Sequence, residues 1–486
     1  MQFNSYSYIL LLGLAAVLFW WLPVRLRRGY VAVLSVLFYA SWNAAYVVVP
    51  LGLSLVAYYC AGRILLAPPE NRGGWLRGGA AIVLLTLLIF KYQQFFFENL
   101  NFLLAAARQS PVRASLALAL PLGISFYSFE AVSYLIDTRQ GRIKQRSFSD
   151  VYLFLMFWPH LMAGPLVRYR ELVPQLQFNR KFEMPMLVRG LDRLIWGLLQ
   201  KNLLANTLGA FVDEGFLPKT AHLNSMLDNW FLALAFGLQI YFDFAAYSNM
   251  AIGSAQLIGV TLPENFRFPY HAKNPSDFWS RWHMTLSRWI RDYLFFPVNA
   301  KFRGAPGPLY ASLIAIMALV GLWHGAGWGF ILWGAIHGVY LVLYRMWERL
   351  SENPRWTRVT QSRPAQALVQ AATIAAVMLA WIPFRASSLG QTLTMLRTAL
   401  TGFSFRTAYS INFHLITLLM AAVVLVEPWL AAAFTRVEKR LSGFTLGPAG
   451  LPWVSYYLFR PAVYALGLLL FLAFDDRDTK FIYFQF

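Results

Sequence analysis

Residues 304–344 read GAPGPLYASLIAIMALVGLWHGAGWGFILWGAIHGVYLVLY and contain no Asp, Glu, Lys or Arg. Three further stretches, 1–24, 29–62 and 364–384, are equally free of these charged residues. A helix that crosses a membrane needs about 20 predominantly apolar residues, so each stretch is long enough for at least one crossing. The pattern predicts an all-α polytopic membrane protein.

The composition of the 486 residues agrees with this interpretation. Hydrophobic residues make up 58% of the chain, aromatic residues 17% and charged residues only 13%. A globular protein of this length has too little interior to bury so many apolar groups. The composition therefore excludes a soluble enzyme, a disordered tail and a fibrous protein.

The chain carries a formal net charge of +20, from 42 Lys and Arg against 22 Asp and Glu. Such an excess is typical of nucleic-acid binding or of the basic loops of a membrane protein. The basic residues form short clusters between apolar stretches, such as Arg25, Arg27 and Arg28. We therefore predict basic loops that face the cytoplasm and anionic lipid headgroups, and no nucleic-acid partner.

The apolar segments predict roughly ten to twelve membrane-crossing or re-entrant helices in a single membrane domain over residues 1–486. These segments are 8–24, 30–48, 49–66, 79–97, 114–136, 150–167, 190–212, 229–260, 308–323, 326–344, 364–384, 408–434 and 456–474. The first segment lacks the basic start and the cleavage pattern of a signal peptide, so we interpret it as a retained helix. The arginines directly after it place the N-terminus outside the cell by the positive-inside rule.

Charged residues and helix breakers occur inside several of these apolar segments. Lys91, Glu130 and Asp243 lie within predicted helices, and each would cost several kcal/mol if it faced lipid at mid-depth. Prolines and glycines interrupt the apolar runs at 159–165 and 321–329. Because broken helices at membrane depth are tolerated only where they line a cavity, the sequence predicts an internal polar chamber.

The sequence offers little for a disulfide framework or a metal centre. Cys60 is the only cysteine and lies in an uncharged run, so we expect it to pack in the core. Seven histidines without a tight cluster argue against a metal site. We predict no metal and no permanently bound cofactor.

Two polar interruptions separate the apolar segments, at 261–307 and 345–363. We interpret the second as a solvated loop. In the first we predict a helix that begins near Phe278, with Asp277 as its N-cap. Its apolar stripe at helical spacing consists of Phe278, Trp282, Leu286, Trp289, Ile290 and Tyr293.

Three arginines occupy other faces of this helix: Arg281, Arg288 and Arg291. Two interpretations stay open. The helix is an amphipathic anchor in the headgroup region, or its arginines bind the phosphates of a donor that approaches from the cytoplasm.

Two histidines in apolar surroundings are candidates for chemistry. His324 lies in the middle of the uncharged stretch 304–344, and His283 lies within the predicted amphipathic helix. An ionisable residue inside an apolar membrane segment is a functional candidate, with a structural histidine as the alternative. His337 would lie about 220° from His324 around a continuous helix. The glycines between them can break that helix, so His337 is a weak candidate, and we expect it to pack near Trp333.

A neutral histidine in a low-dielectric chamber suits acyl transfer, because it can take a proton from a hydroxyl that attacks an activated carbonyl. A serine hydrolase would need a G-x-S-x-G elbow, and the sequence has none. Two other classes are weaker: a transporter with Asp243, Glu130 and His324 as a proton relay, and a structural scaffold. No internal repeat supports the transporter, and a scaffold would not need histidines in an apolar interior.

Seven blocks together resemble the membrane-bound O-acyltransferase family, specifically the bacterial branch that acetylates alginate and related exported polysaccharides. They are PLGISFYSFEAVSYLIDTRQG at 121–141, FWPHLMAGPLVRYREL at 157–172, YFDFAAYSNMAIGSAQLIG at 241–259, PENFRFPY at 263–270, DFWSRWHMTLSRWIRDYLFFP at 277–297, GLWHGAGWGFILWGAIHG at 321–338 and FIYFQF at 481–486. The resemblance covers about residues 120–486, and the first 110 residues match only in hydropathy.

The resemblance implies that His324 corresponds to the catalytic histidine of the family and His283 to its second polar residue. It also implies a ring of helices around a central tunnel, wide on the cytoplasmic side for the acyl donor. Residues that would line this tunnel or bind the donor are Arg281, Trp282, Arg288, Arg291, Trp323, Asp243 and Asn249. For Asp243, pairing or capping inside the fold is an equal alternative.

The same resemblance implies a relay across the bacterial inner membrane. An O-acetyltransferase of this kind would take an acetyl group from acetyl-CoA and pass it to an extracytoplasmic partner of the SGNH-hydrolase type, which acetylates an exported polysaccharide such as alginate. The alternative within the family is transfer of D-alanine from a carrier protein to a cell-wall polymer. Length and the FIYFQF ending favour acetylation.

Overall fold

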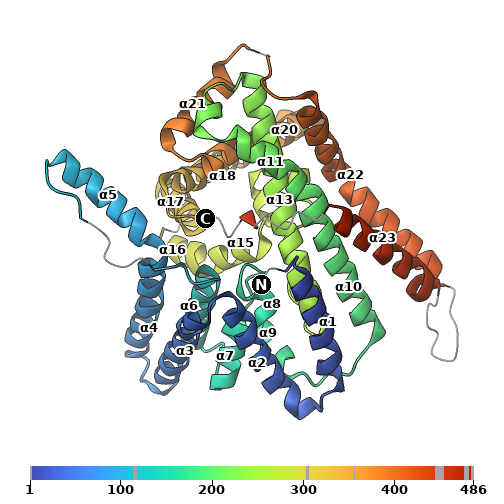
Figure 1. Cartoon of the computed structure of the whole chain (residues 1–486). Coiled ribbons are helices and arrows are strands. Elements are labelled where there is room, and N and C mark those ends of the chain that lie inside the picture. Colours follow the sequence, from blue (N-terminus) through green and yellow to red (C-terminus); the bar gives the residue numbers. More distant parts are fainter. Residues whose placement is uncertain are drawn as a thin grey trace. The chain divides into compact units, whose positions relative to one another are not determined.

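The computed structural model describes residues 3–112, 118–302, 306–354, 356–404, 406–443, 454–474 and 481–482. These residues form helices joined by turns and loops, and no strand occurs among them (Figure 1). The all-α fold predicted from the sequence is confirmed.

Seven helical segments of the described chain are long and apolar enough to cross a membrane. They are Val24–Leu66, Arg72–Ala106, Met226–Leu257, Gly307–His324, Trp328–Glu352, Arg363–Arg385 and Ile411–Leu441. Two shorter apolar helices, Tyr6–Trp21 and Arg460–Ala473, add to them. The first two long segments each contain two α-helices, so the set is compatible with the roughly ten to twelve crossing or re-entrant elements predicted. The central tunnel stays a prediction.

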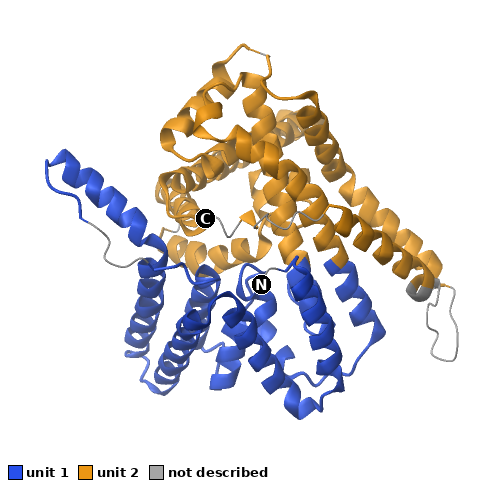
Figure 2. Ribbon diagram, viewed as in Figure 1, with its two compact units in different colours: residues 1–194, 250–263 blue, residues 195–249, 264–486 orange. Residues whose placement is uncertain are grey.

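The chain divides into two compact units (Figure 2). Unit 1 consists of residues 1–194 and 250–263, and unit 2 consists of residues 195–249 and 264–486. Helices α10 (Met184–Leu199) and α13 (Met226–Leu257) contribute residues to both units. The single membrane domain expected from the sequence stays a prediction.

Unit 1 is built around the mutual packing of three helices, α3, α4 and α6. A Cβ atom at Gly79 of α4 would lie 2.9 Å from Leu135 of α6 and 3.0 Å from Cys60 of α3, so only glycine allows this close approach. Cys60 is buried there and free, as expected for core packing. The helices of unit 1 are α1 (Tyr6–Trp21), α2 (Val24–Asn43), α3 (Val48–Leu66), α4 (Arg72–Leu87), α5 (Gln93–Ala106), α6 (Ile124–Arg139), α7 (Phe148–Met156), α8 (Trp158–Leu161) and α9 (Tyr169–Leu172).

Two of the predicted apolar segments are interrupted in the structure, the first of them at a predicted helix breaker. The predicted segment 150–167 is split into α7 and α8, because Pro159 has no N–H to donate and stands in the first turn of α8. The segment 190–212 is divided by a π-helical turn, Gln200–Ala205, between α10 and α11 (Asn206–Gly215). Both interruptions lie within otherwise apolar sequence.

The three charged residues predicted to avoid lipid each have a polar partner inside the protein. In unit 1, Lys91 donates to the Ser125 hydroxyl at 3.2 Å, and Glu130 lies 3.3 Å from the Nδ1 atom of His160. In unit 2, Asp243 lies 2.7 Å from the Lys201 ammonium group. The prediction that these groups face protein or water is confirmed.

In unit 2, helices α17 and α18 form the most extensive helix pair of the described chain. A Cβ atom at Gly321 would overlap the carbonyl oxygen of Phe330, and one at Gly334 would overlap that of Met317. The two backbones are therefore in direct contact. The remaining helices of unit 2 are α11 (Asn206–Gly215), α12 (Pro218–Ala221), α14 (Pro275–Arg281), α15 (Met284–Ile290), α16 (Phe296–Asn299), α17 (Pro306–His324), α18 (Trp328–Glu352), α19 (Thr357–Thr360), α20 (Arg363–Arg385), α21 (Leu389–Thr401), α22 (Ile411–Ser442) and α23 (Arg460–Ala473).

The region 345–363 was predicted to be a solvated loop, but part of it is helical. Helix α18 continues to Glu352, and the short helix α19 follows at Thr357–Thr360. Arg345 and Glu348 form an ion pair of 3.6 Å one turn apart, which supports the charged end of α18. The charged sequence is thus partly a helical extension of an apolar helix.

Candidate active site

The structure brings His283 and His324 together inside unit 2. Their ring centroids lie 6.2 Å apart, with an angle of 62° between the ring planes. His283 is 0% exposed and His324 5%, so the pair is shielded from bulk solvent. His324 is the last residue of α17, and Gly325 to Gly327 separate it from the start of α18 at Trp328. The predicted helix break after His324 is confirmed.

His283 occupies a sharp kink rather than the interior of one helix. Its φ angle is 42°, in the left-handed region that non-glycine residues rarely adopt. Helix α14 ends at Arg281 and α15 begins at Met284, so the continuous helix predicted from Phe278 onward is wrong. The backbone of the preceding loop holds the kink, because the Met284 N–H donates to the Asn265 carbonyl at 2.9 Å.

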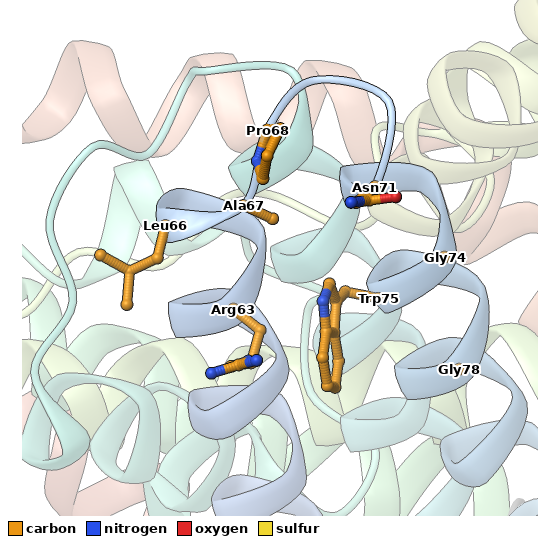
Figure 3. A pocket seen from close by; sticks show the side chains of 8 residues that line it. All are labelled: Arg63, Leu66, Ala67, Pro68, Asn71, Gly74, Trp75 and Gly78. Carbon is orange, nitrogen blue, oxygen red and sulfur yellow. The ribbon is translucent and has the colours of Figure 1, made fainter.

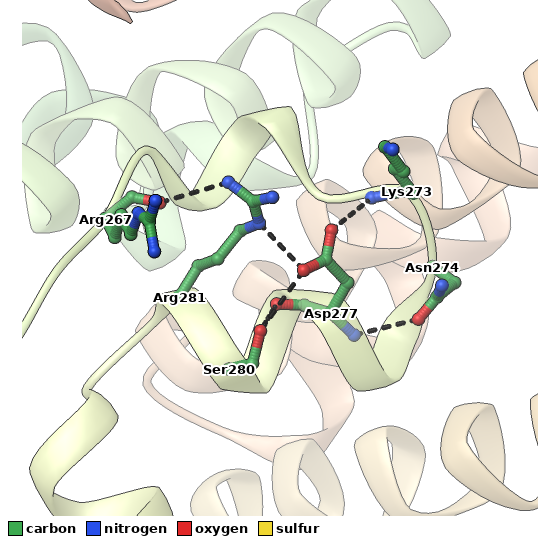
Figure 4. A network of polar contacts seen from close by, with 6 residues as sticks. All are labelled: Arg267, Lys273, Asn274, Asp277, Ser280 and Arg281. Carbon is green, nitrogen blue, oxygen red and sulfur yellow. Dashed lines mark hydrogen bonds and ion pairs between the residues drawn. The ribbon is translucent and has the colours of Figure 1, made fainter.

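The N-terminus of α14 also differs from the prediction. Asn274 is the N-cap, and its side-chain oxygen accepts from the Asp277 N–H at 2.8 Å. The predicted cap, Asp277, lies in the first turn and accepts from the Lys273 N–H and from Arg281 (Figure 4). Burial alone would raise the pKa of Asp277, but these hydrogen bonds hold it below its ordinary value. Pro275 at the first helical position was the sequence signal for the true start.

Asn265 fixes the orientation of His283, and sequence reasoning missed this role. Its side-chain oxygen lies 3.1 Å from Nδ1 of His283 and accepts from the Thr285 hydroxyl at 2.9 Å. Its side-chain nitrogen donates to the Ser248 hydroxyl at 3.1 Å. The backbone N–H of Thr285 also faces the amide oxygen, so the oxygen and not the nitrogen must point toward His283. The proton of the neutral imidazole is therefore on Nδ1.

This assignment leaves the Nε2 lone pair of His283 as a hydrogen-bond acceptor. Nε2 is buried and makes no hydrogen bond within the part of the chain that the structure describes. Burial lowers the pKa of His283 to about 3, so the ring is neutral at physiological pH. The only signal for Asn265 in the sequence was its place in the block PENFRFPY at 263–270.

An aromatic enclosure surrounds the two histidines. His324 contacts the rings of Trp323, Trp333 and Phe384, with centroid distances of 4.9, 5.1 and 5.6 Å. His283 lies 4.7 Å from Phe244, and Trp323 lies 6.1 Å from His283, so Trp323 contacts both histidines. Such an apolar shell lowers the local dielectric constant and strengthens any charge interaction that develops during a reaction.

Trp282, predicted to line a tunnel, is 1% exposed and packs next to this enclosure, with its ring centroid 5.0 Å from that of Trp381. The other members of the predicted apolar stripe are also buried, although α14, α15 and the π-helical turn Arg291–Phe295 carry them rather than one helix. They are Phe278, Leu286, Trp289, Ile290 and Tyr293. The sequence pattern therefore predicted correctly which of these side chains are buried.

Asp243 and Asn249 contact the π-helical turn Gln200–Ala205. Asp243 pairs with Lys201 and accepts from the Ile482 N–H at 2.8 Å, and Asn249 donates to the Gln200 side chain at 2.7 Å. These are internal pairs, which is the alternative that the sequence left open for Asp243. Their part in lining a tunnel stays a prediction.

The three arginines of the predicted donor site already have protein partners. Arg281 pairs with Asp277 at 2.8 Å, and Arg291 pairs with Asp292 at 2.9 Å. Arg288 donates to the backbone oxygen of Met284 at 3.3 Å. All three are at least partly exposed, so their guanidinium groups retain donors for a further ligand. Donor binding by these arginines stays a prediction.

His337 packs as expected and does not join the pair. Its ring centroid lies 5.0 Å from Trp333 and 5.2 Å from Trp279, and it is 1% exposed. Within the described ranges, no group of three or more His, Cys, Asp or Glu side chains is arranged to hold a metal ion. The candidate site is therefore the pair His283 and His324, with Asn265 as the residue that positions the first.

The fold and the site together define a class: a multi-pass helical membrane protein whose candidate catalytic groups are two adjacent buried histidines. A model described as MBOAT, membrane-bound O-acyltransferase family, matches residues 17–387. The chain therefore belongs to the membrane-bound O-acyltransferase family. The match begins well before the first block at 121, so the family resemblance extends further toward the N-terminus than the quoted blocks indicated.

Similar proteins carry acyltransferase names. The chain is 34% identical to the probable alginate O-acetylase AlgI of Azotobacter vinelandii, over 88% of this chain and 83% of that protein. It is 33% identical to the peptidoglycan O-acetyltransferase of Helicobacter pylori, over 75% and 72%. It is 30% identical to the teichoic acid D-alanyltransferase of Bacillus subtilis, over 48% and 61%. The protein is an O-acyltransferase.

Proposed function

We propose that this protein is an O-acetyltransferase that moves acetyl groups from a cytoplasmic donor, acetyl-CoA, across the bacterial inner membrane for O-acetylation of an exported polysaccharide such as alginate. The observation that carries the proposal is the buried pair of His283 and His324 in an aromatic enclosure, in a chain of this family. The similarity to alginate and peptidoglycan O-acetylating proteins over most of the chain supports acetyl as the group and a polysaccharide as the acceptor.

His324 is the general base or the nucleophile of the reaction. As a base, it takes the proton from an acceptor hydroxyl while the hydroxyl oxygen attacks the thioester carbonyl. The C–S bond then breaks, and the leaving thiolate takes the proton back from the imidazolium. As a nucleophile, it would carry the acetyl group on a ring nitrogen between the two transfers. The shielded, apolar surroundings keep water from competing for the thioester in either case.

His283 has an orienting role in this proposal. Polarising a carbonyl requires an N–H donor, but the Nδ1 proton of His283 is directed at Asn265, and Nε2 can only accept. An acceptor at this position can hold the N–H of the neighbouring His324 ring or an N–H of the donor. This geometry supports an orienting role for His283 over polarisation of the acyl carbonyl.

The acetyl group has to leave the membrane protein for its final acceptor. We propose that an extracytoplasmic protein of the SGNH-hydrolase type receives it and transfers it to the sugar hydroxyls. The donor is anionic, and Arg281, Arg288 and Arg291 supply cationic groups of the kind that bind phosphates. The net charge of +20 favours the approach of such a donor.

A second function, D-alanyl transfer from a carrier protein to a cell-wall polymer, has one specific observation in its favour. Teichoic acid D-alanyltransferases of Bacillus subtilis and Streptococcus thermophilus are each 30% identical to this chain. These matches cover 48% and 47% of the chain, against 88% for the alginate O-acetylase of Azotobacter vinelandii. The longer match favours acetyl transfer.

The experiment that separates the two functions is a comparison of donors. Membranes that contain the protein and its candidate extracytoplasmic partner are incubated with radiolabelled acetyl-CoA or with a radiolabelled D-alanyl carrier protein. We expect label on the partner or its polymer from acetyl-CoA only. Transfer from the D-alanyl carrier alone would replace the proposal with the second function, and transfer from neither donor would refute both.

A further inference from the structure

A pocket of about 630 Å³ lies in unit 1 at the turn between α3 and α4 (Figure 3). Arg63 of α3 and Trp75 of α4 lie next to each other in its wall, and Asn71 stands at the turn above them. Gly74 and Gly78 form part of the wall on α4. None of these residues belongs to the histidine site, which lies entirely in unit 2.

The polar end of the pocket is cationic. The Arg63 guanidinium group lies 4.8 Å from the Trp75 ring centroid, is exposed, and forms no ion pair within the described residues. Arg72 and Arg77 follow on the same helix as Trp75, and Glu70 is the only acidic residue between positions 63 and 78. An exposed arginine held against an indole ring is a binding group for a phosphate at the depth of the headgroups.

The rest of the pocket is open and apolar. A Cβ atom at Gly74 or Gly78 would meet nothing within 4 Å, so the two glycines leave the wall of α4 unfilled. Exposed apolar side chains continue from the pocket along both helices at helical spacing. They are Leu55 and Tyr59 on α3, which precede Arg63 at intervals of four, and Ile82 and Leu85 on α4, which follow Gly78.

This combination matches an amphipathic anion better than a small soluble one. We propose that the pocket binds an anionic glycerophospholipid, with the phosphate at Arg63 and an acyl chain along the apolar stripes of α3 and α4. The turn between α3 and α4 lies on the same side of unit 1 as the turn between α1 and α2 (Figure 1). The exposed Arg25 stands in the first turn of α2, directly after that turn. A leaflet rich in anionic lipid attracts such basic turns.

The test measures lipid binding by the full-length protein in detergent, by native mass spectrometry during titration with phosphatidylglycerol or phosphatidylcholine. Arg63→Gln removes the charge. Gly78→Leu fills the pocket, and it leaves the fold intact because the site is open and leucine favours a helix more than glycine. Matched controls are Arg25→Gln in the first turn of α2 and Gly13→Leu on α1, where a side chain also meets nothing within 4 Å.

We expect the wild-type protein to bind phosphatidylglycerol in preference to phosphatidylcholine. Arg63→Gln and Gly78→Leu should each weaken that binding about fivefold or more, and both controls should keep wild-type affinity. Equal binding of the two lipids, or equal losses in the controls, would overturn the proposal. Displacement of the lipid by inorganic phosphate at similar concentration would also overturn it, because the site would then recognise a free anion.

Discussion

Replacement of Asn265 by alanine tests whether the orientation of His283 matters for transfer. The change removes the acceptor of the His283 Nδ1–H and of the Thr285 hydroxyl, and the donor to Ser248. It keeps the Asn265 backbone carbonyl, which holds the kink through Met284. An unsatisfied buried donor costs about 1–3 kcal/mol, so the oriented ring should lose about 5- to 150-fold in population.

The assay is acetyl transfer in membranes, with kcat and KM measured separately at equal protein levels. We expect Asn265→Ala to lower kcat about 10- to 100-fold with a smaller change in KM, because the substituted residue acts on the ring and not on the donor. Thr285→Val is the matched control. It removes one hydrogen bond to the same amide oxygen but leaves the contact of His283, and we expect a change of at most about threefold.

Asn265→Asp adds a readout that a purely structural role would not change. A carboxylate beside His283 favours the imidazolium, so it raises the pKa of His283 from about 3 toward neutrality. Activity that needs neutral His283 should then fall as the pH decreases through the raised pKa. The two proteins differ only at residue 265, so the difference between the two pH profiles reports His283. Wild-type kcat in Asn265→Ala, or superimposable pH profiles for Asn265→Asp and wild type, would refute the reasoning.

Three further predictions concern stability, each measured by thermal unfolding in detergent. Because the pKa of His283 is depressed in the folded state, the unfolded chain binds its proton first as the pH falls. Stability is therefore lost from about pH 6.5 toward pH 3, and the loss should be shallower in His283→Gln. Identical slopes of stability against pH in the two proteins would contradict this. Gly334→Val places side-chain atoms where α17 and α18 touch, and we expect severe destabilisation, whereas Gly13→Val on the open face of α1 should change little; equal effects would contradict the backbone contact. Lys201→Met leaves Asp243 buried without its cation and should lower the free energy of unfolding by about 3–5 kcal/mol. The double variant Lys201→Met, Asp243→Asn should regain most of this loss. Additive losses from the two substitutions would contradict the pairing.

The helical membrane fold could be predicted because its signals are local. Uncharged runs such as 304–344 exceed the length of a membrane helix, and their boundaries follow from charges and prolines. The break after His324 could be expected from the glycines in GLWHGAGWG, which separate α17 from α18. His283 was marked as an ionisable residue within the predicted amphipathic helix.

The geometry around His283 could not be predicted in the same way. Helical periodicity continues through Phe278, Trp282 and Leu286, but hydrogen bonds from the loop of Asn265 impose a left-handed residue that local propensity disfavours. A contact between residues this far apart along the chain leaves no periodic signal. The role of Asn265 therefore became visible only in the structure.

The partners of buried charged residues could not be predicted from the sequence either. Asp243 has the same sequence environment whether it lines a tunnel or pairs with Lys201, because the π-helical turn that brings Lys201 to it is a tertiary feature. The choice between Asp277 and Asn274 as the cap of α14 was local, and Pro275 at the first helical position was the signal for Asn274.

The most direct test of the central claim is transfer from radiolabelled acetyl-CoA by His324→Ala in membranes with the extracytoplasmic partner. His222→Ala is the matched control, because His222 is exposed and lies outside the histidine pair. We expect label on the partner or its polymer with the wild type and His222→Ala, and a loss of at least about 100-fold with His324→Ala at equal protein level. Undiminished transfer by His324→Ala would contradict the account.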